Sequence, residues 1–163
     1  RSKRILKNYL HDDPELRSKV LHAEKPFEFI IGDAMISGTI DLLNKADPAG
    51  ENEAKVEIVD FKTGKSGDDL AAAERRSHVL QMYAIATQDA LGLEPLKATA
   101  HFLYANQPHI KEDVELSEEQ MENMKHQIAN TVTAIKQGRF PLCASKTRCT
   151  SCDFKAICNG STR

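Results

Sequence analysis

The chain has 163 residues, of which 40% are apolar and 28% charged, and its formal net charge is −2 at neutral pH. A chain of this length is expected to form one domain whose hydrophobic core stands without disulfide bonds. Its longest apolar runs fall far short of the roughly 20 residues that a membrane-spanning helix needs, which argues against a membrane protein. Since neither a signal peptide nor an initiator Met is present, we expect a cytoplasmic piece of a longer protein.

The first half of the chain is predicted to be a short helical segment followed by three strands. Ile5, Tyr9 and neighbouring apolar residues recur at helical spacing, and Asp13 could cap a second short helix that begins at Pro14. Apolar, alternating stretches then predict strands over residues 20–31, 34–43 and 54–62. The order of these strands suggests an antiparallel meander.

Two helices and two strands are predicted in the second half of the chain. In order they are a helix over residues 70–91, strands over residues 98–104 and 109–116, and a helix that begins after Ser117 and ends at Gly138. Gly92 follows the first of these helices where a C-terminal cap belongs. Ser117, with Gln120 three residues later, forms the pattern of a capping box.

All four cysteines lie in the C-terminal segment, with the spacing C-x5-C-x2-C-x5-C. They are Cys143, Cys149, Cys152 and Cys158. A disulfide framework is typical of secreted chains, and nothing else in the sequence indicates secretion. Thiolates two residues apart can converge on one tetrahedral centre, so the segment is interpreted as a metal site, with iron and zinc both open.

The charge is unevenly distributed along the chain. From Ile135 onward the net charge is +5, which leaves −7 for the rest. Such a basic segment is either a solvated terminus or a surface that faces phosphates, and the sequence leaves both interpretations open.

Three ionisable side chains interrupt strands that are otherwise apolar. Asp41 ends the stretch Gly38-Thr39-Ile40-Asp41, and Asp60 and Lys62 stand two apart in the following strand. Because side chains alternate along a strand, Asp60 and Lys62 share a face, and Asp41 can approach Asp60 if the two strands pair. Adjoining carboxylates hold a hard divalent cation, beside which Lys62 could stabilise the charge of a phosphate. The combination predicts hydrolysis of a phosphodiester.

A bare D-x-K pair is more often a surface ion pair than a catalytic site. The surrounding sequence pattern therefore has to decide whether Asp60 and Lys62 are catalytic.

A nucleotide-binding loop that ends in Gly64-Lys65-Ser66 is excluded, because its first glycine would have to be residue 59, which is Val59.

The wider pattern resembles a known family of enzymes. The stretches that carry the resemblance are G-T-I-D ending at Asp41, I-V-D-F-K-T-G-K from Ile58 to Lys65, a helix with Gln81 and Tyr83, and the final C-x2-C-x5-C. Together they are similar to the PD-(D/E)XK nuclease superfamily. Within it they resemble the RecB-type exonuclease domain of UvrD-like helicases, of the AddB subunit of helicase-nucleases and of CRISPR-associated RecB-like exonucleases.

The resemblance implies a fold and an organisation. The fold would be α/β (α+β) with a restriction-endonuclease-like core: a mixed central sheet with an antiparallel meander, flanked by helices, plus a C-terminal cysteine-rich metal-bound tail. Residues 1–22 would form an N-terminal helical segment, residues 23–138 the nuclease core, and residues 139–163 the tail docked on the core.

The resemblance also implies roles for individual residues. Asp41 and Asp60 would bind Mg²⁺ or Mn²⁺ together with the Phe61 carbonyl, and Lys62 would be the catalytic lysine. Gln81 is a further catalytic candidate, with His78 as the alternative for the same role, because the family spaces the Gln and Tyr of its helix motif by four residues rather than two. The metal-binding His or Glu that relatives carry on an upstream helix has no convincing counterpart in residues 1–22.

For the cysteines the resemblance implies a [4Fe-4S] cluster, with Zn²⁺ as the alternative. Cys149, Cys152 and Cys158 match the cysteine trio of the iron-sulfur members of the family. The fourth ligand would be Cys143 or a residue outside this chain.

The expected function is metal-dependent hydrolysis of DNA, as an exonuclease, by the C-terminal part of a helicase-nuclease that works in DNA repair or recombination. Its partners would be DNA and a helicase motor domain in the same or a partner chain. The alternatives are a catalytically inactive nuclease-like domain that clamps DNA or scaffolds a helicase, and a zinc-stabilised DNA-binding domain.

Overall fold

The computed structural model describes residues 2–47, 54–63, 70–104, 108–142, 149–150 and 152–158 of the chain. The chain divides into two compact units: residues 1–129, which contain the sheet, and residues 130–163, which contain the end of the last helix and the cysteine segment. Within the described ranges, no helix is long and apolar enough to cross a membrane.

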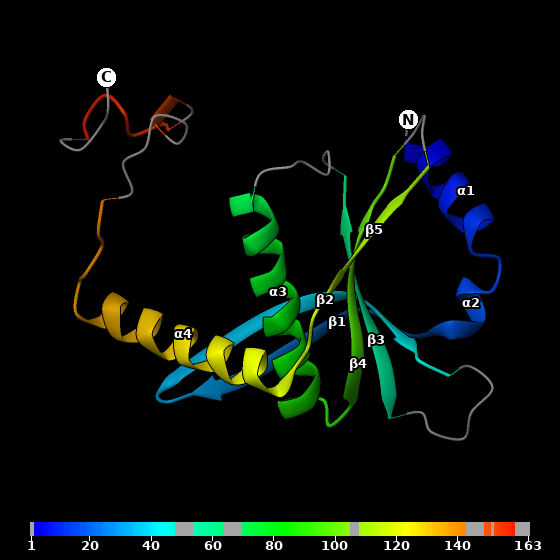
Figure 1. The fold of residues 1–163 in the computed structure, drawn as a ribbon, viewed down its shortest axis with the longest axis horizontal. Coiled ribbons are helices and arrows are strands. Elements are labelled where there is room, and N and C mark those ends of the chain that lie inside the picture. The colour runs from blue at the N-terminus through cyan, green and yellow to red at the C-terminus, as the bar shows by residue number, and fades with distance from the viewer. Residues whose placement is uncertain are drawn as a thin grey trace. The chain divides into compact units, whose positions relative to one another are not determined.

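Five strands form one mixed sheet in the order β1-β2-β3-β4-β5 (Figure 1). They are β1 Val20–Ile31, β2 Ala34–Lys45, β3 Lys55–Lys62, β4 Glu94–Phe102 and β5 Ile110–Val114. The first three strands pair antiparallel, as do β4 and β5, whereas β3 and β4 run parallel. The predicted antiparallel meander and the mixed α/β sheet are therefore confirmed.

Four helices of the described part of the chain accompany the sheet. They are α1 Ser2–Asp12, α2 Leu16–Lys19, α3 Leu70–Asp89 and α4 Glu118–Lys136. Parallel strands need a crossover connection, and α3 supplies it between β3 and β4. Figure 1 shows α3 on one side of the sheet and α1 with α2 on the other. The central strands are thus covered on both faces.

Several boundaries follow local signals of the sequence. Gly92 and Gly138 take φ values of +65° and +63° just after α3 and α4, in the left-handed region that suits glycine. The Ser117 Oγ accepts a hydrogen bond from the Gln120 N–H at 3.4 Å, so the predicted cap of α4 forms.

The starts of two elements differ from the sequence prediction by two residues or more. The second helix begins at Leu16 rather than at Pro14, because the Asp13 side chain is held by Lys19 at 3.2 Å and does not cap the helix. β4 begins at Glu94, upstream of the alternating stretch that predicted it. Its first residues lack the alternating pattern but pair in parallel with β3, which makes them part of the strand.

Two hydrophobic clusters hold the helices against the sheet. The cluster on the α3 side includes Ile40, Leu43, Ile58, Leu80, Ile85 and Met121. The cluster on the α1 side is built from Tyr9, Leu16, Leu42 and Val59, with Phe61 packed against it. Since Ile58 and Val59 are neighbours on β3 and lie in different clusters, β3 is buried on both faces. By the same alternation Asp60 and Lys62 face the α3 side, and Phe61 faces α1.

Candidate active site

Asp41 and Asp60 lie at adjoining positions of β2 and β3. The two strands pair with Leu42 opposite Val59, and Asp41 and Asp60 are the next residues along each strand. The Phe61 N–H donates a hydrogen bond of 2.7 Å to Asp41 Oδ2, which ties the carboxylate of one strand to the backbone of the other. The structure therefore brings both carboxylates to the end of β3.

Asp60 is buried next to a partly exposed lysine. Its side chain is 5% exposed, against 35% for Lys62, and the Lys62 ammonium forms an ion pair with Asp60 Oδ2. Burial raises the pKa of the Asp60 carboxyl and the Asp41 charge also raises it, whereas the hydrogen bond and charge of Lys62 lower it. A carboxylate in this setting gains from further positive charge placed beside it.

The oxygen atoms at this site are suitable ligands for a hard divalent cation. Two carboxylates on adjoining strands and the backbone carbonyl of Phe61 are oxygen ligands of the kind that Mg²⁺ prefers, and this ion usually keeps several waters. Among the residues that the structure describes, no three His, Cys, Asp or Glu side chains are grouped to hold a metal. A cation here would therefore rely on Asp41, Asp60 and the Phe61 carbonyl, with water and substrate oxygens as its remaining ligands.

Tyr83 of α3 and Glu24 of β1 lie near Asp41 and Asp60. Burial raises the pKa of the Tyr83 hydroxyl, and the charges of Asp60, Asp41 and Glu24 raise it further. Glu24 lies across from Asp41, because the residues on either side of it pair with those on either side of Asp41. Its φ of +49° is the one positive value among the described non-glycine residues. Glu24 was not predicted as a neighbour of the site, because only the register of β1 and β2 reveals its position.

Gly38 allows close packing beside Asp41. A Cβ on residue 38 would lie 2.7 Å from Cζ of Phe27, its partner on β1. The Phe27 ring contacts the Tyr83 ring edge-on, with the centroids 5.8 Å apart. The glycine of the G-x-I-D stretch thus lets β1, β2 and Tyr83 approach one another.

Gln81 points away from Tyr83 along α3. Two residues advance a helix by about 200°, so the two side chains lie on different sides of it. The Gln81 amide donates a 2.7 Å hydrogen bond to Gln120 Oε1 of α4 and is buried there. The structure therefore gives this catalytic candidate a place between α3 and α4.

On the opposite face of the sheet, an aromatic group supports the same end of β3. The Tyr9 ring of α1 packs edge-on against Phe61, with the centroids 5.3 Å apart. The Tyr9 hydroxyl is hydrogen-bonded to Nδ1 of His101 at 2.8 Å. Burial lowers the pKa of His101 to about 4, and the charges of Lys111 and Lys97 also lower it. None of these contacts joins residues near in sequence, so local patterns do not reveal them.

The described cysteines do not form the expected metal centre. Cys149 is buried, Cys158 is half-buried and Cys152 is exposed, and no metal-binding group of three thiolates occurs among the residues described. Cys143 lies outside the described residues. The iron-sulfur and zinc expectations rested on the family resemblance and on the cysteine spacing, and the described residues do not support them.

Comparison with protein families covers nearly the whole chain. The model of the PD-(D/E)XK nuclease superfamily matches residues 1–159. The chain belongs to this superfamily. The resemblance inferred from the sequence is thus confirmed. None of the curated proteins matches this PD-(D/E)XK domain.

Two solved structures are similar to this PD-(D/E)XK domain. A candidate exonuclease from Eubacterium rectale is 8% identical, with a TM-score of 0.59 over 99% of this chain. The chain spans 60% of the length of that protein. A protein named SSO0001 is 15% identical, with a TM-score of 0.49 over 97% of this chain and 67% of its own. At such low identity, the Eubacterium rectale structure supports the restriction-endonuclease-like fold alone.

Proposed function

We propose that this PD-(D/E)XK domain is a divalent-metal-dependent deoxyribonuclease whose active site consists of Asp41, Asp60, the Phe61 carbonyl and Lys62. The observation that carries the proposal is the register of β2 and β3, with Asp41 tied to the Phe61 N–H and Lys62 paired with Asp60. Membership of a nuclease superfamily supports phosphodiester hydrolysis as the reaction.

The residues of the site have separate tasks in this proposal. Asp41 and Asp60 hold the cation, which when bound lowers the pKa of a water ligand and offsets phosphate charge. The hydrogen bond from Phe61 fixes one oxygen of Asp41 and leaves the other for the cation. Lys62 orients the attacking water and stabilises the negative charge that develops on the phosphate. Because Asp60 is buried, bulk water is excluded on its side and these charge interactions are strengthened.

Cleavage of end-labelled DNA by the intact chain with Mg²⁺ or Mn²⁺ tests the proposal. We expect Asp60→Ala and Lys62→Ala each to lower the rate by about 10²-fold or more. Lys97 and Asp113 form a matched Asp-Lys pair, 3.1 Å apart, on the opposite face of the sheet. Lys97→Ala and Asp113→Ala should therefore keep the wild-type rate.

Wild-type rates in both active-site variants would overturn the proposal. DNA binding by the wild type without any metal-dependent cleavage would instead favour an inactive nuclease-like DNA-binding domain.

We further propose that cleavage starts at DNA ends and that the domain works beside a helicase motor in repair or recombination. The support is the resemblance of the D-F-K-T-G-K and G-x-I-D stretches to RecB-type exonuclease domains. Linear DNA should be degraded while a closed circle of the same sequence stays intact. Cutting of the circle at a comparable rate would contradict an exonuclease.

A further inference from the structure

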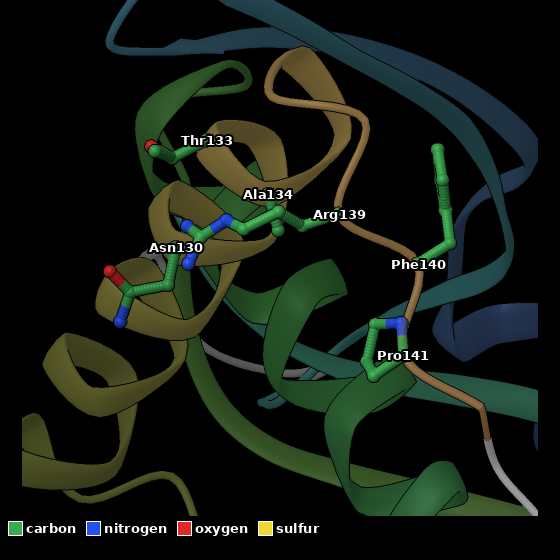
Figure 2. Close-up of a pocket in the computed structure, with 6 residues that line it drawn as sticks. All are labelled: Asn130, Thr133, Ala134, Arg139, Phe140 and Pro141. Atoms are coloured by element: carbon green, nitrogen blue, oxygen red, sulfur yellow. The ribbon is translucent and has the colours of Figure 1, made fainter.

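A cavity of about 740 Å³ lies in the C-terminal unit, where α4 meets the segment that follows it. Figure 2 shows its lining, which consists of Asn130, Thr133, Ala134, Arg139, Phe140 and Pro141. None of these residues belongs to the proposed active site. Asn130, Thr133 and Ala134 lie on α4, and Arg139, Phe140 and Pro141 lie in the basic segment that follows.

The end of α4 directs Arg139 to this cavity. Gly138 takes a φ of +63°, and the Arg139 N–H donates a 2.8 Å hydrogen bond to the Ala134 carbonyl, as in a Schellman cap. The chain reverses at this cap, and Figure 2 shows the Arg139 side chain extended back across α4 toward Asn130. A guanidinium with five N–H donors thus lines the same cavity as the polar side chains of Asn130 and Thr133.

An exposed aromatic ring follows the arginine. Phe140 is 73% exposed, and Pro141 after it restricts the backbone and so limits where the ring can go. Both Arg139 and Phe140 belong to the segment from Ile135 onward, whose net charge of +5 attracts polyanions. An exposed ring and a cation that line one cavity can hold single-stranded nucleic acid, with the ring stacking on a base and the cation binding the backbone.

We propose that this cavity is a binding site for single-stranded DNA, in which a base stacks on Phe140 and a neighbouring phosphate binds Arg139. The inference rests on the proposed deoxyribonuclease function and gives that enzyme a second place to hold its substrate. Bases in a duplex are already stacked on both sides, so the site selects single strands over duplexes.

Binding of a labelled single-stranded oligonucleotide to the intact chain, in EDTA to prevent cleavage, tests the site. The double variant Arg139→Ala/Phe140→Ala should lose about tenfold in affinity, within the range that one stacked base contributes. Arg139→Lys/Phe140→Trp should recover most of it, since charge and ring return. Phe154 and Lys155 offer a matched aromatic-basic pair in the same unit outside this cavity, with Phe154 69% exposed. Phe154→Ala/Lys155→Ala should bind like the wild type.

Several results would overturn the site: no loss in the cavity variant, an equal loss in the matched variant, or equal affinity of the wild type for duplex DNA. Thermal melting identifies a variant that is unfolded, and the Lys/Trp variant then supplies the comparison. Cleavage assays separate the two proposals. If the wild type fails to cut but the cavity variant loses binding, the nuclease proposal alone fails; if the wild type cuts and the cavity variant binds normally, the cavity site alone fails.

Discussion

The two faces of β3 present opposite environments at the same end of one strand. Toward α3, Asp60 and Lys62 carry charge in a partly buried place, and burial raises the pKa of the Asp60 carboxyl. Toward α1, Phe61 packs against Tyr9, whose hydroxyl bonds to His101. The α3 face of β3 therefore carries charged groups whose burial lowers stability. The α1 face carries the aromatic packing that holds this end of the strand in position. Substitutions on the two faces should separate activity from stability.

The largest expected effect is on the charged face. Asp60→Asn keeps the shape of the side chain and removes its charge, so cleavage should fall by about 10²-fold or more. The free energy of unfolding should stay the same or rise, because the variant removes a carboxylate whose burial costs stability, as its raised pKa indicates. Cleavage assays and urea unfolding on the same preparation check both parts. A loss of several kcal/mol in stability would show that Asp60 is a structural residue.

On the aromatic face, Tyr9→Ala should lower the free energy of unfolding by about 3–5 kcal/mol, because a buried ring is removed from between α1 and the sheet. Tyr9→Phe should cost about 1–3 kcal/mol, since the buried His101 loses its hydrogen-bond partner. Urea unfolding measures both. The folded Tyr9→Phe variant should cut DNA at nearly the wild-type rate, and a rate as low as that of Asp60→Asn would contradict the separation of the two faces.

The same face should make the fold sensitive to acid. The pKa of His101 is lowered from 6.5 to about 4 in the folded protein, so the unfolded chain binds a proton more readily between these values. The free energy of unfolding should be highest above about pH 6.5 and should fall as the pH drops toward 4. Unfolding curves across this window should show a shallower fall for His101→Gln. Identical slopes in the two proteins would exclude His101 as the cause.

The smallest effect is expected between α3 and α4. Gln81→Ala removes the hydrogen bond to Gln120 and should lower the free energy of unfolding by about 1 kcal/mol. Because Gln81 lies on the other side of α3 from Tyr83, cleavage should remain close to the wild-type rate. A loss as large as that of Lys62→Ala would instead make Gln81 part of the active site.

The fold was predictable where local chemistry decides it. Alternating apolar residues located β1, β2 and β3, and Gly92 and Gly138 marked the helix ends. Asp41, Asp60 and Lys62 stood out because charged residues in buried strands are costly unless they have a function. The alternation of β3 also correctly placed Asp60 and Lys62 on one face.

Other features depend on tertiary structure and could not be read from the sequence. The contact of Tyr9 with His101 joins residues 92 apart, and the position of Glu24 follows from strand register. The partner of Gln81 on α4 depends on how two helices pack. The cysteine spacing likewise does not decide where the thiols lie: among the described residues, Cys149, Cys152 and Cys158 are not grouped as metal ligands, and Cys143 lies outside those residues.

Binding of Mn²⁺ to the intact chain, followed by electron paramagnetic resonance, tests whether Asp41 and Asp60 share a cation. We expect the wild type to bind Mn²⁺ at this site, and Asp41→Asn and Asp60→Asn each to weaken binding by about tenfold or more. Asp113→Asn, on the other face of the sheet, should bind like the wild type. Wild-type affinity in both Asp41→Asn and Asp60→Asn would contradict a metal site between β2 and β3.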